Sequence, residues 1–218
     1  METTRWSCVL FDLDGTVADT IDLIMSSYEH ALKSVLGVEV DRSVIRSWIG
    51  RTLRVTFETG WPEHVDELIA AYREWNNAHL ATMVTAYDGI PELVSDLTTA
   101  GIVTGVATAK NREVAIDSLL VAGIDLPITV AAQDTTRHKP DPAPLLLAQH
   151  RLGMTTEPTV YVGDALVDVA AAKAAGMDAI AVTWGAGEPD ALVAAEPTAV
   201  ASTVGELRSI LLGGEPEW

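Results

Sequence analysis

Two carboxylates near the start of the chain, Asp12 and Asp14, directly follow the apolar run at residues 8–11. The run predicts a buried strand, and Gly15-Thr16 end it. Residues two apart in a strand share a face, and open α/β sheets build their sites at the carboxyl ends of their strands. One carboxylate could therefore act as a nucleophile and the other as an acid–base group, or both could approach a hard cation. An ordinary acidic turn is the alternative.

Two further polar signals follow later apolar runs. Thr108 stands after the run at residues 102–107 and shortly before a predicted helix, so its hydroxyl and the free N–H groups there could hold an anion. Lys139 precedes Pro140 in a stiff loop, where its ammonium could meet a phosphate oxygen. Taken singly, Thr108 is better explained as an ordinary helix N-cap, and a solvated lysine in a proline turn is the commoner case for Lys139.

A second pair of carboxylates, Asp164 and Asp168, begins where another buried run ends. A spacing of four residues is about one helical turn, so both can face the same side. Together with Asp12 and Asp14 they would form a cluster of like charges that repel one another. Mg²⁺ takes oxygen ligands and bridges to substrate phosphate, so the cluster predicts a magnesium site.

The elements that must position these residues alternate between short apolar runs and helical patterns. This alternation predicts an α/β fold with a parallel sheet covered by helices on both faces. The later strands are expected at residues 102–107, 128–132, 159–162 and 179–183, with a short sixth at 198–201. The helices among and after them are expected at residues 91–100, 112–122, 142–151, 167–175, 189–195 and 203–212.

The segment at residues 19–85 breaks this alternation, because only helical patterns occur in it. It is too long for a simple crossover between parallel strands, which needs about a dozen residues. We therefore expect residues 19–85 to form a helical cap domain, inserted into an α/β core domain of residues 1–18 and 86–218. The cap helices are expected at residues 20–36, 41–48, 52–58 and 63–83, with Trp48, Trp61 and Trp75 in their core.

Taken together, these signals resemble the haloacid-dehalogenase-like (HAD) phosphohydrolase superfamily. The match consists of Asp-x-Asp-Gly-Thr at residues 12–16, Thr108, Lys139 and Gly-Asp-x-x-x-Asp at residues 163–168, in that order. Any one piece is weak, and the ordered set is strong. The resemblance covers nearly the whole chain, and it implies a Rossmann-like sheet with strand order 3-2-1-4-5 and an inserted cap. The most similar subgroup contains phosphoglycolate phosphatases, pyrophosphatases and β-phosphoglucomutases.

The resemblance also implies roles for individual residues. Asp12 would attack phosphorus to form an aspartyl-phosphate, and Asp14 would protonate the leaving group and then activate water. Thr108 and Lys139 would hold the phosphoryl oxygens. The expected Mg²⁺ ligands are Asp12, Asp14 through its backbone carbonyl, and Asp164, with Asp168 in a supporting position or bound through water. Gly15, Thr16, Ala109 and Lys110 are the further residues expected around the phosphoryl group.

The cap is expected to recognise the remainder of the substrate. Its candidates are Arg51 and Arg54, which follow Gly50 and could pair with a carboxylate or a second phosphate. A solvated arginine near the start of a helix is the alternative. The expected enzyme is a Mg²⁺-dependent phosphatase of a small phosphorylated metabolite resembling phosphoglycolate. Pyrophosphatase and phosphomutase activities remain alternatives, and a non-catalytic binding protein is a remote one.

Composition limits the partners. A formal net charge of −17 disfavours nucleic acid and anionic membrane surfaces. The one cysteine, Cys8, cannot form an intrachain disulfide and is expected to be a small core residue. No signal peptide and no apolar run of about 18 residues is evident, so a cytoplasmic protein is expected. Both a monomer and a homodimer remain open.

Overall fold

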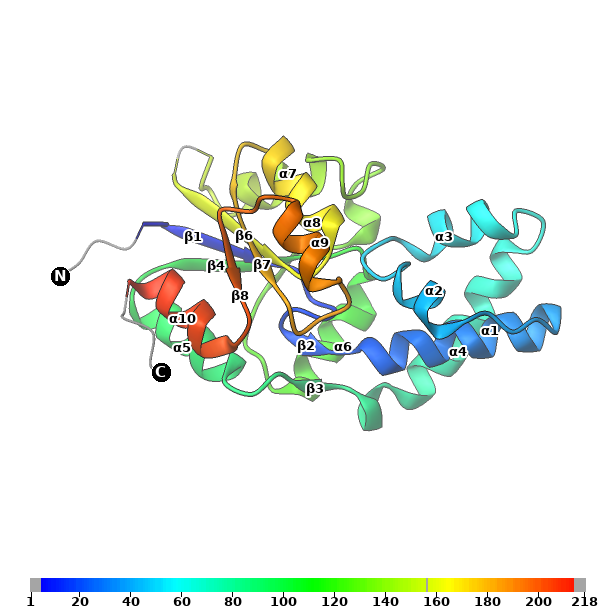
Figure 1. The fold of residues 1–218 in the computed structure, drawn as a ribbon. Helices are drawn as coiled ribbons and strands as arrows, with labels where there is room; N and C mark the ends of the chain where they lie inside the picture. The colour runs from blue at the N-terminus through cyan, green and yellow to red at the C-terminus, as the bar shows by residue number, and fades with distance from the viewer. Residues whose placement is uncertain (1–4, 156, 214–218) are drawn as a thin grey trace.

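The sheet at the centre of the molecule has six strands in the order β5-β4-β1-β6-β7-β8 (Figure 1). The computed structural model describes residues 5–155 and 157–213. The strands are β1 (Cys8–Phe11), β4 (Val103–Ala107), β5 (Ile128–Val130), β6 (Thr159–Gly163), β7 (Asp178–Val182) and β8 (Ala199–Ala201). Every neighbouring pair is parallel. Counted along the chain, the order is 3-2-1-4-5-6, so the expected order is confirmed and the sixth strand lies at the edge.

The central strand β1 is buried along its whole length because it is paired on both edges and covered on both faces. Cys8 is paired with Val103 of β4 and with Thr159 of β6. Successive side chains then alternate between two apolar clusters, with Val9 and Phe11 in one and Cys8 and Leu10 in the other. This explains why the strand has a continuous apolar sequence with no alternation.

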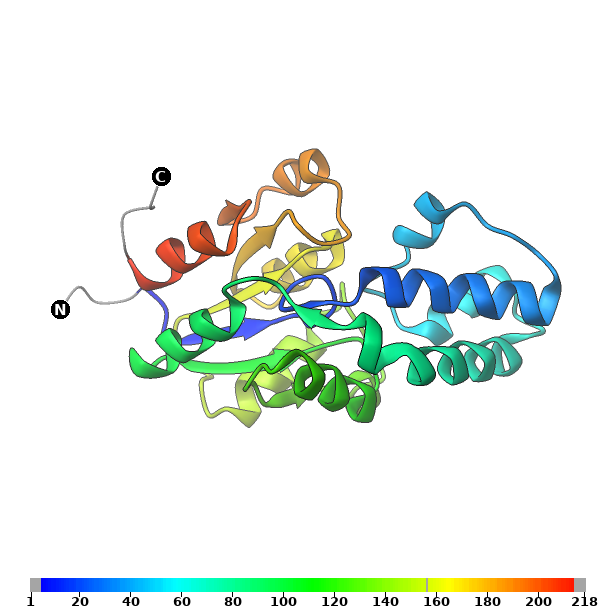
Figure 2. The same cartoon turned by 90° about the horizontal axis from the view of Figure 1, so that it is seen from below.

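Helices cover both faces of the sheet (Figures 1 and 2). On the face of Val9 and Phe11 they are α5 (Ile90–Thr99), α6 (Arg112–Ala122) and α10 (Val204–Leu212). On the face of Leu10 they are α7 (Ala143–Arg151), α8 (Leu166–Ala174) and α9 (Pro189–Ala194), and a 3₁₀ turn, η1 (Ala132–Asp134), follows β5. Among the described helices, none has the length and apolar character that crossing a bilayer requires.

Four helices stand beside the sheet domain and form the helical lobe, residues 21–83 (Figure 2). They are α1 (Ile21–Leu36), α2 (Arg42–Arg46), α3 (Leu53–Gly60) and α4 (Val65–Met83). Their apolar cluster centres on Tyr28, whose ring makes edge contacts with Phe57 and Tyr72 at centroid distances of 5.4 and 4.9 Å. The lobe therefore has an apolar core of its own.

The tryptophan prediction for this lobe is only partly correct. Trp48 and Trp61 pack against the lobe cluster, as expected. Trp75 instead packs against the cluster of the sheet domain and stacks on His79, with ring centroids 3.9 Å apart. The reason is its position in the C-terminal half of α4, where Leu80 and Met83 also belong to the sheet-domain cluster.

Two short strands join the lobe to the sheet domain. β2 (Ala18–Asp19) and β3 (Thr85–Ala86) form an antiparallel pair. Strands of two residues leave no periodic signal, so the sequence did not predict them. The expected cap limits, residues 19 and 85, lie within this pair.

Candidate active site

The loop after β1 carries the first two carboxylates. The backbone N–H of Asp12 donates to the Val162 carbonyl at 2.8 Å, which extends the pairing with β6 beyond the end of β1. Gly15 then turns the chain with a φ of +77°, and a Cβ at this position would overlap the Asp164 carboxylate. The glycine of the motif thus allows the Asp12 loop and Asp164 to lie in contact.

Asp12 is buried and only partly compensated. Its Oδ1 lies 3.1 Å from the ammonium of Lys139, but the angles do not form a hydrogen bond, and this oxygen has no hydrogen-bond partner among the described residues. Burial raises the pKa of Asp12; the charge of Lys139 opposes the shift, and Asp168 and Asp164 add to it. The carboxylate therefore has an oxygen available for a ligand or a reaction.

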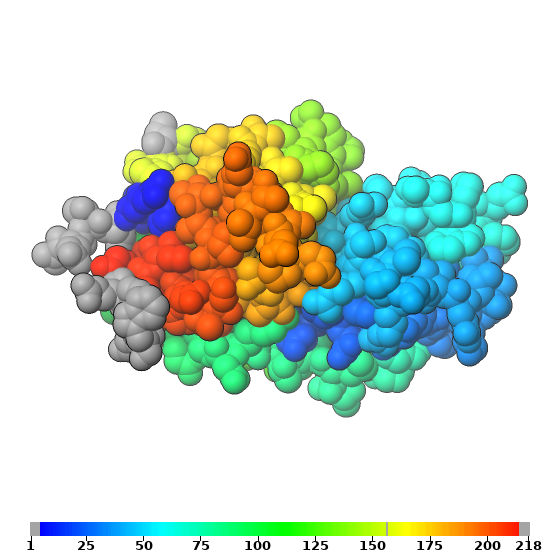
Figure 3. All heavy atoms as spheres, viewed as in Figure 1, coloured from blue at the N-terminus to red at the C-terminus, as the bar shows by residue number. Residues whose placement is uncertain are grey.

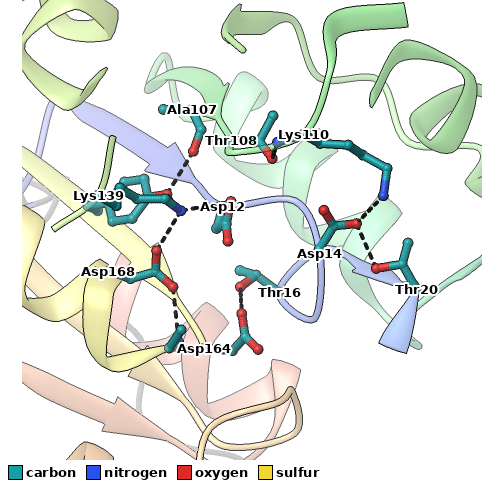
Figure 4. A network of polar contacts seen from close by, with 12 residues as sticks. Asp12, Asp14, Thr16, Thr20, Ala107, Thr108, Lys110, Lys139, Asp164 and Asp168 are labelled. Carbon is teal, nitrogen blue, oxygen red and sulfur yellow. Dashed lines mark hydrogen bonds and ion pairs between the residues drawn. The ribbon is translucent and has the colours of Figure 1, made fainter. Parts of the chain in front are cut away.

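Lys139 links β6 to α8 and, through Tyr161, to the end of β4. Its Nζ donates to Asp168 at 2.6 Å and to the Tyr161 hydroxyl at 2.9 Å. That hydroxyl donates to the Ala107 carbonyl at 2.8 Å, directly before Thr108. Burial opposes the charge of Lys139, but Asp12 and Asp168 hold its pKa well above the usual value. Lys139 is therefore a fixed cation beside Asp12 (Figure 4).

The residues fit a metal ion. Each of Asp12, Asp164 and Asp168 offers a carboxylate oxygen, and these oxygens lie within 4.8 Å of one another. Lys139 is the one cation that contacts this group in the described chain, so the cluster keeps an excess of negative charge in a buried place. Hard oxygen donors, among them the Asp12 Oδ1 that makes no hydrogen bond, suit Mg²⁺.

The two later carboxylates are held in place by hydrogen bonds. Asp164 accepts from the Thr16 hydroxyl at 3.0 Å and from the Ala186 N–H at 2.6 Å. Burial and the charge of Asp168 raise the pKa of Asp164, while these two bonds act against the shift. Asp168 accepts from Lys139 and from the Ala165 N–H, the latter at 3.0 Å. Both oxygens are hydrogen-bonded in each of the two carboxylates, but only Asp168 is bonded to a cation, Lys139, which suits a supporting position.

Asp14 lies outside the carboxylate cluster. Its Oδ1 accepts from the Lys110 ammonium and from the Thr20 hydroxyl, each at 2.7 Å. Figure 4 shows Lys110 reaching Asp14 from one side of the loop, while Lys139 reaches Asp12 from the other. The expected proton-transfer residue and the expected nucleophile are thus each paired with their own lysine.

A cavity of about 530 Å³ opens between the sheet domain and the helical lobe. Five of the expected site residues line it from the sheet domain, and both expected arginines line it from the lobe: Asp12, Asp14, Thr108, Ala109, Lys110, Arg51 and Arg54. The remaining five, Gly15, Thr16, Lys139, Asp164 and Asp168, are not among its lining residues. Thr16 bonds to Asp164 instead, and Lys139 borders a small adjoining cavity beside Thr108.

The two expected arginines differ in their surroundings. Arg54 forms ion pairs with Asp66 at 2.8 Å and with Glu58 at 3.5 Å. The side chain of Arg51 has no ion-pair partner within the described chain, so its guanidinium can bind an anion in the cavity. Arg73 lines the same cavity from α4 and was not predicted, because nothing in its sequence context separates it from a solvated helix residue.

Comparison with known proteins identifies the class. The sequence pattern of the family described as haloacid dehalogenase-like hydrolase matches residues 9–182. The chain is 35% identical to the pyrophosphatase PpaX of Bacillus velezensis over 212 residues, which cover 96% of this chain and 98% of that protein. It is 34% identical to PpaX of Halalkalibacterium halodurans over 205 residues, covering 93% and 95% of the two chains.

A solved structure gives the same result for the fold. A predicted phosphatase from Clostridium acetobutylicum superposes with a TM-score of 0.83 at 26% identity, covering 95% of this chain and 99% of the other. The parallel sheet with carboxylates at the ends of β1 and β6 therefore defines a hydrolase class. This chain belongs to the haloacid dehalogenase-like hydrolase family, so the expected family and the expectation of a hydrolase are confirmed.

Proposed function

We propose that the protein is a Mg²⁺-dependent phosphohydrolase that acts through an aspartyl-phosphate on Asp12. The observation that carries this proposal is the Oδ1 atom of Asp12. It is buried without a hydrogen bond, belongs to a carboxylate cluster, and its residue lines a cavity that Arg51 also lines. A carboxylate in this setting can bind a cation with one oxygen and attack phosphorus with the other.

The residues around Asp12 divide the reaction between them. The Asp12 carboxylate would attack phosphorus as the bond to the leaving oxygen breaks, and Asp14 would give that oxygen a proton. Asp14 would then take a proton from water as the water attacks the aspartyl-phosphate, which releases phosphate and restores Asp12. Thr108, at the end of β4, would bind a phosphoryl oxygen, and the fixed charge of Lys139 would stabilise the developing negative charge.

Asp12, Asp164 and the backbone carbonyl of Asp14 would hold Mg²⁺, with Asp168 supporting. When bound, the ion would neutralise the carboxylates and stabilise charge on the transferred phosphoryl group. The carboxylate cluster and the Asp12 oxygen that makes no hydrogen bond support this assignment.

The substrate we propose is a small phosphate compound with a second anionic group, which Arg51 would bind. Phosphoglycolate and pyrophosphate both meet this description. The names of the relatives that match over nearly their whole length favour pyrophosphate. The apolar side chains that line the cavity from the lobe, Ile24, Trp48, Ile49 and Ile69, favour an organic phosphate. A sugar phosphate that is isomerised faster than it is hydrolysed would point to a phosphomutase.

Phosphate release from pyrophosphate, phosphoglycolate, a sugar phosphate and an aryl phosphate tests the proposal, measured with Mg²⁺ and after chelation. We expect release to require Mg²⁺ and to be lost in Asp12→Asn, with the circular dichroism spectrum unchanged. A larger ion, Ca²⁺, should suppress the activity because it favours more ligands in a looser geometry. Release by Asp12→Asn at the parental rate, or full activity with no metal detectable, would contradict the proposal.

A further inference from the structure

The loop at residues 183–187, between β7 and α9, lies directly against the proposed metal ligand Asp164. The Ala186 N–H donates to the Asp164 carboxylate at 2.6 Å, and the Gly187 N–H donates to the Asp164 carbonyl at 3.1 Å. A Cβ on Gly185 would overlap both the Asp164 carboxylate and the Gly15 carbonyl. The loop therefore helps to set where the Asp164 carboxylate lies.

The helical lobe holds the same loop from the other side. Arg46, the last residue of α2, donates from Nε to the Ala186 carbonyl at 3.0 Å and from Nη2 to the Gly185 carbonyl at 2.5 Å. The Ala186 side chain is buried within the apolar cluster of the lobe. Ala186 thus contacts the lobe through its carbonyl and methyl groups, and contacts Asp164 through its N–H.

A second contact of the lobe lies at the residues that follow Asp164 in the chain. Gly50, with a φ of +90°, is so close to the start of α8 that a Cβ would lie 3.3 Å from Ala165 and 3.2 Å from Val167. Figure 3 shows the lobe resting against the sheet domain on this face. The lobe therefore touches the chain both directly after Asp164 and at the loop that bonds to its carboxylate.

We propose that Arg46 is a positioning residue that couples the docking of the lobe to metal binding at Asp164. The path has two steps, from the Arg46 guanidinium to the carbonyls of Gly185 and Ala186, and from the Ala186 N–H to Asp164. When the lobe is docked, the Ala186 N–H keeps Asp164 in place for the cation. When Arg46 releases the loop, the carboxylate loses this restraint, and the affinity for Mg²⁺ falls. This inference rests on the proposed metal site.

Coupling of this kind is reciprocal. If docking of the lobe increases the affinity for Mg²⁺, Mg²⁺ must favour the docked lobe by the same factor. The proposal can therefore be tested by two independent measurements, neither of which needs substrate or turnover.

The first measurement is Mg²⁺ affinity by titration calorimetry of the chelator-treated full chain. We expect Arg46→Ala to raise the Kd about fivefold or more, the usual lower range of such coupling. Arg46→Lys, which keeps one cationic donor, should recover part of this loss. The matched control is Arg42→Ala on the same helix, because Arg42 pairs with Asp22 and Glu29 inside the lobe. This control should leave the Kd unchanged.

The second measurement is amide hydrogen exchange in residues 42–50 and 183–190. Mg²⁺ should slow exchange in both segments of the parent protein and of Arg42→Ala, and should have a smaller effect in Arg46→Ala. An equal Kd for the parent protein and a folded Arg46→Ala would overturn the coupling while leaving the metal site intact. A parent protein that binds no Mg²⁺, or binds it unchanged after Asp164→Asn, would instead refute the proposed metal site and the coupling with it.

Discussion

The two lysines of the site, Lys139 and Lys110, have different surroundings, which indicate different functions. Lys139 is buried among Asp12, Asp168 and Tyr161, so it is a permanent part of the charge balance beneath the cavity. Lys110 lines the cavity and contacts Asp14 through its ammonium. The sequence predicted Lys110 as a ligand of the substrate. Its contact in the structure suggests instead that it orients the group that transfers protons.

Substitution of Lys110 separates these two roles. If Lys110 orients Asp14, Lys110→Met should reduce kcat by about tenfold to a hundredfold for a substrate with a poor leaving group, because a misplaced Asp14 would lose part of the roughly 10²–10⁴-fold that a proton-transfer group contributes. An aryl phosphate, whose leaving oxygen needs little protonation, should lose much less. Lys173→Met serves as the control, because that ammonium bonds to the Ala195 carbonyl on the surface. Equal losses on both substrates would show that Lys110 acts on the transferred phosphoryl group.

At the scale of elements, the segment from Gly50 into α3 presents the two expected arginines to the cavity. It carries one arginine without an ion-pair partner and one that is paired twice. Arg54 already neutralises Asp66 and Glu58, whereas the described chain gives Arg51 no carboxylate. Their neighbouring positions make them a matched pair for testing how the substrate is recognised.

We expect Arg51→Ala to reduce kcat/KM for a doubly anionic substrate. The corresponding activation free energy should rise by about 1.5–3 kcal/mol, the usual contribution of a hydrogen bond to a charged group. An aryl phosphate without the second charge should be barely affected. Arg54→Ala should cost less on the anionic substrate because its charge is already shared with two carboxylates. Steady-state kinetics of both variants on both substrates check this. Losses of the same size on both substrates would show that Arg51 does not recognise the second anionic group.

Elements with strong periodicity could be predicted from the sequence, and contacts between distant segments could not. The run before Asp12 predicted β1 because a strand buried on both faces must be apolar throughout. The strand expected at residues 128–132 ends at Val130, because the Asp134 side chain accepts from the Ala131 N–H and turns the chain into η1. That local bond competes with strand pairing and leaves no trace in apolar periodicity.

The residues of the site, too, were only partly predictable from the sequence. Asp12, Asp164 and Asp168 were predicted together because the carboxyl ends of parallel strands meet at one edge. Tyr161 was read only as part of an apolar strand, yet its hydroxyl joins Lys139 to the end of β4. Arg46 gave no signal either, because its partners are backbone carbonyls 139 and 140 residues away. Such contacts depend on the final packing, which one sequence does not specify locally.

At the scale of the whole molecule, the cations that line the cavity oppose the negative charge of the chain. The formal net charge of −17 repels anions at long range. Lys110, Arg51 and Arg73 place positive charge along the cavity, and a bound Mg²⁺ would add to it. An anionic substrate therefore gains its attraction only near the cavity, within about 10 Å at ordinary salt. A movement that brings the lobe arginines nearer to Asp12 would strengthen that attraction after the substrate enters.

The structure favours a rigid rotation of the lobe as that movement. The lobe has its own apolar cluster, and β2 and β3, of two residues each, join it to the sheet domain. Bending at this pair would leave the lobe cluster intact, close the cavity and exclude water while the aspartyl-phosphate forms.

We expect Mg²⁺ with a phosphate analogue such as orthovanadate to reduce the radius of gyration of the protein in solution scattering. Crystal structures with and without the analogue should differ by a rotation in which the lobe cluster around Tyr28 moves as one body. Asp12→Asn is the control, because it lacks the carboxylate that would bond to the analogue and should therefore show no such change. An unchanged lobe orientation in both crystal structures, or rearrangement around Tyr28 within the lobe cluster, would contradict rigid closure.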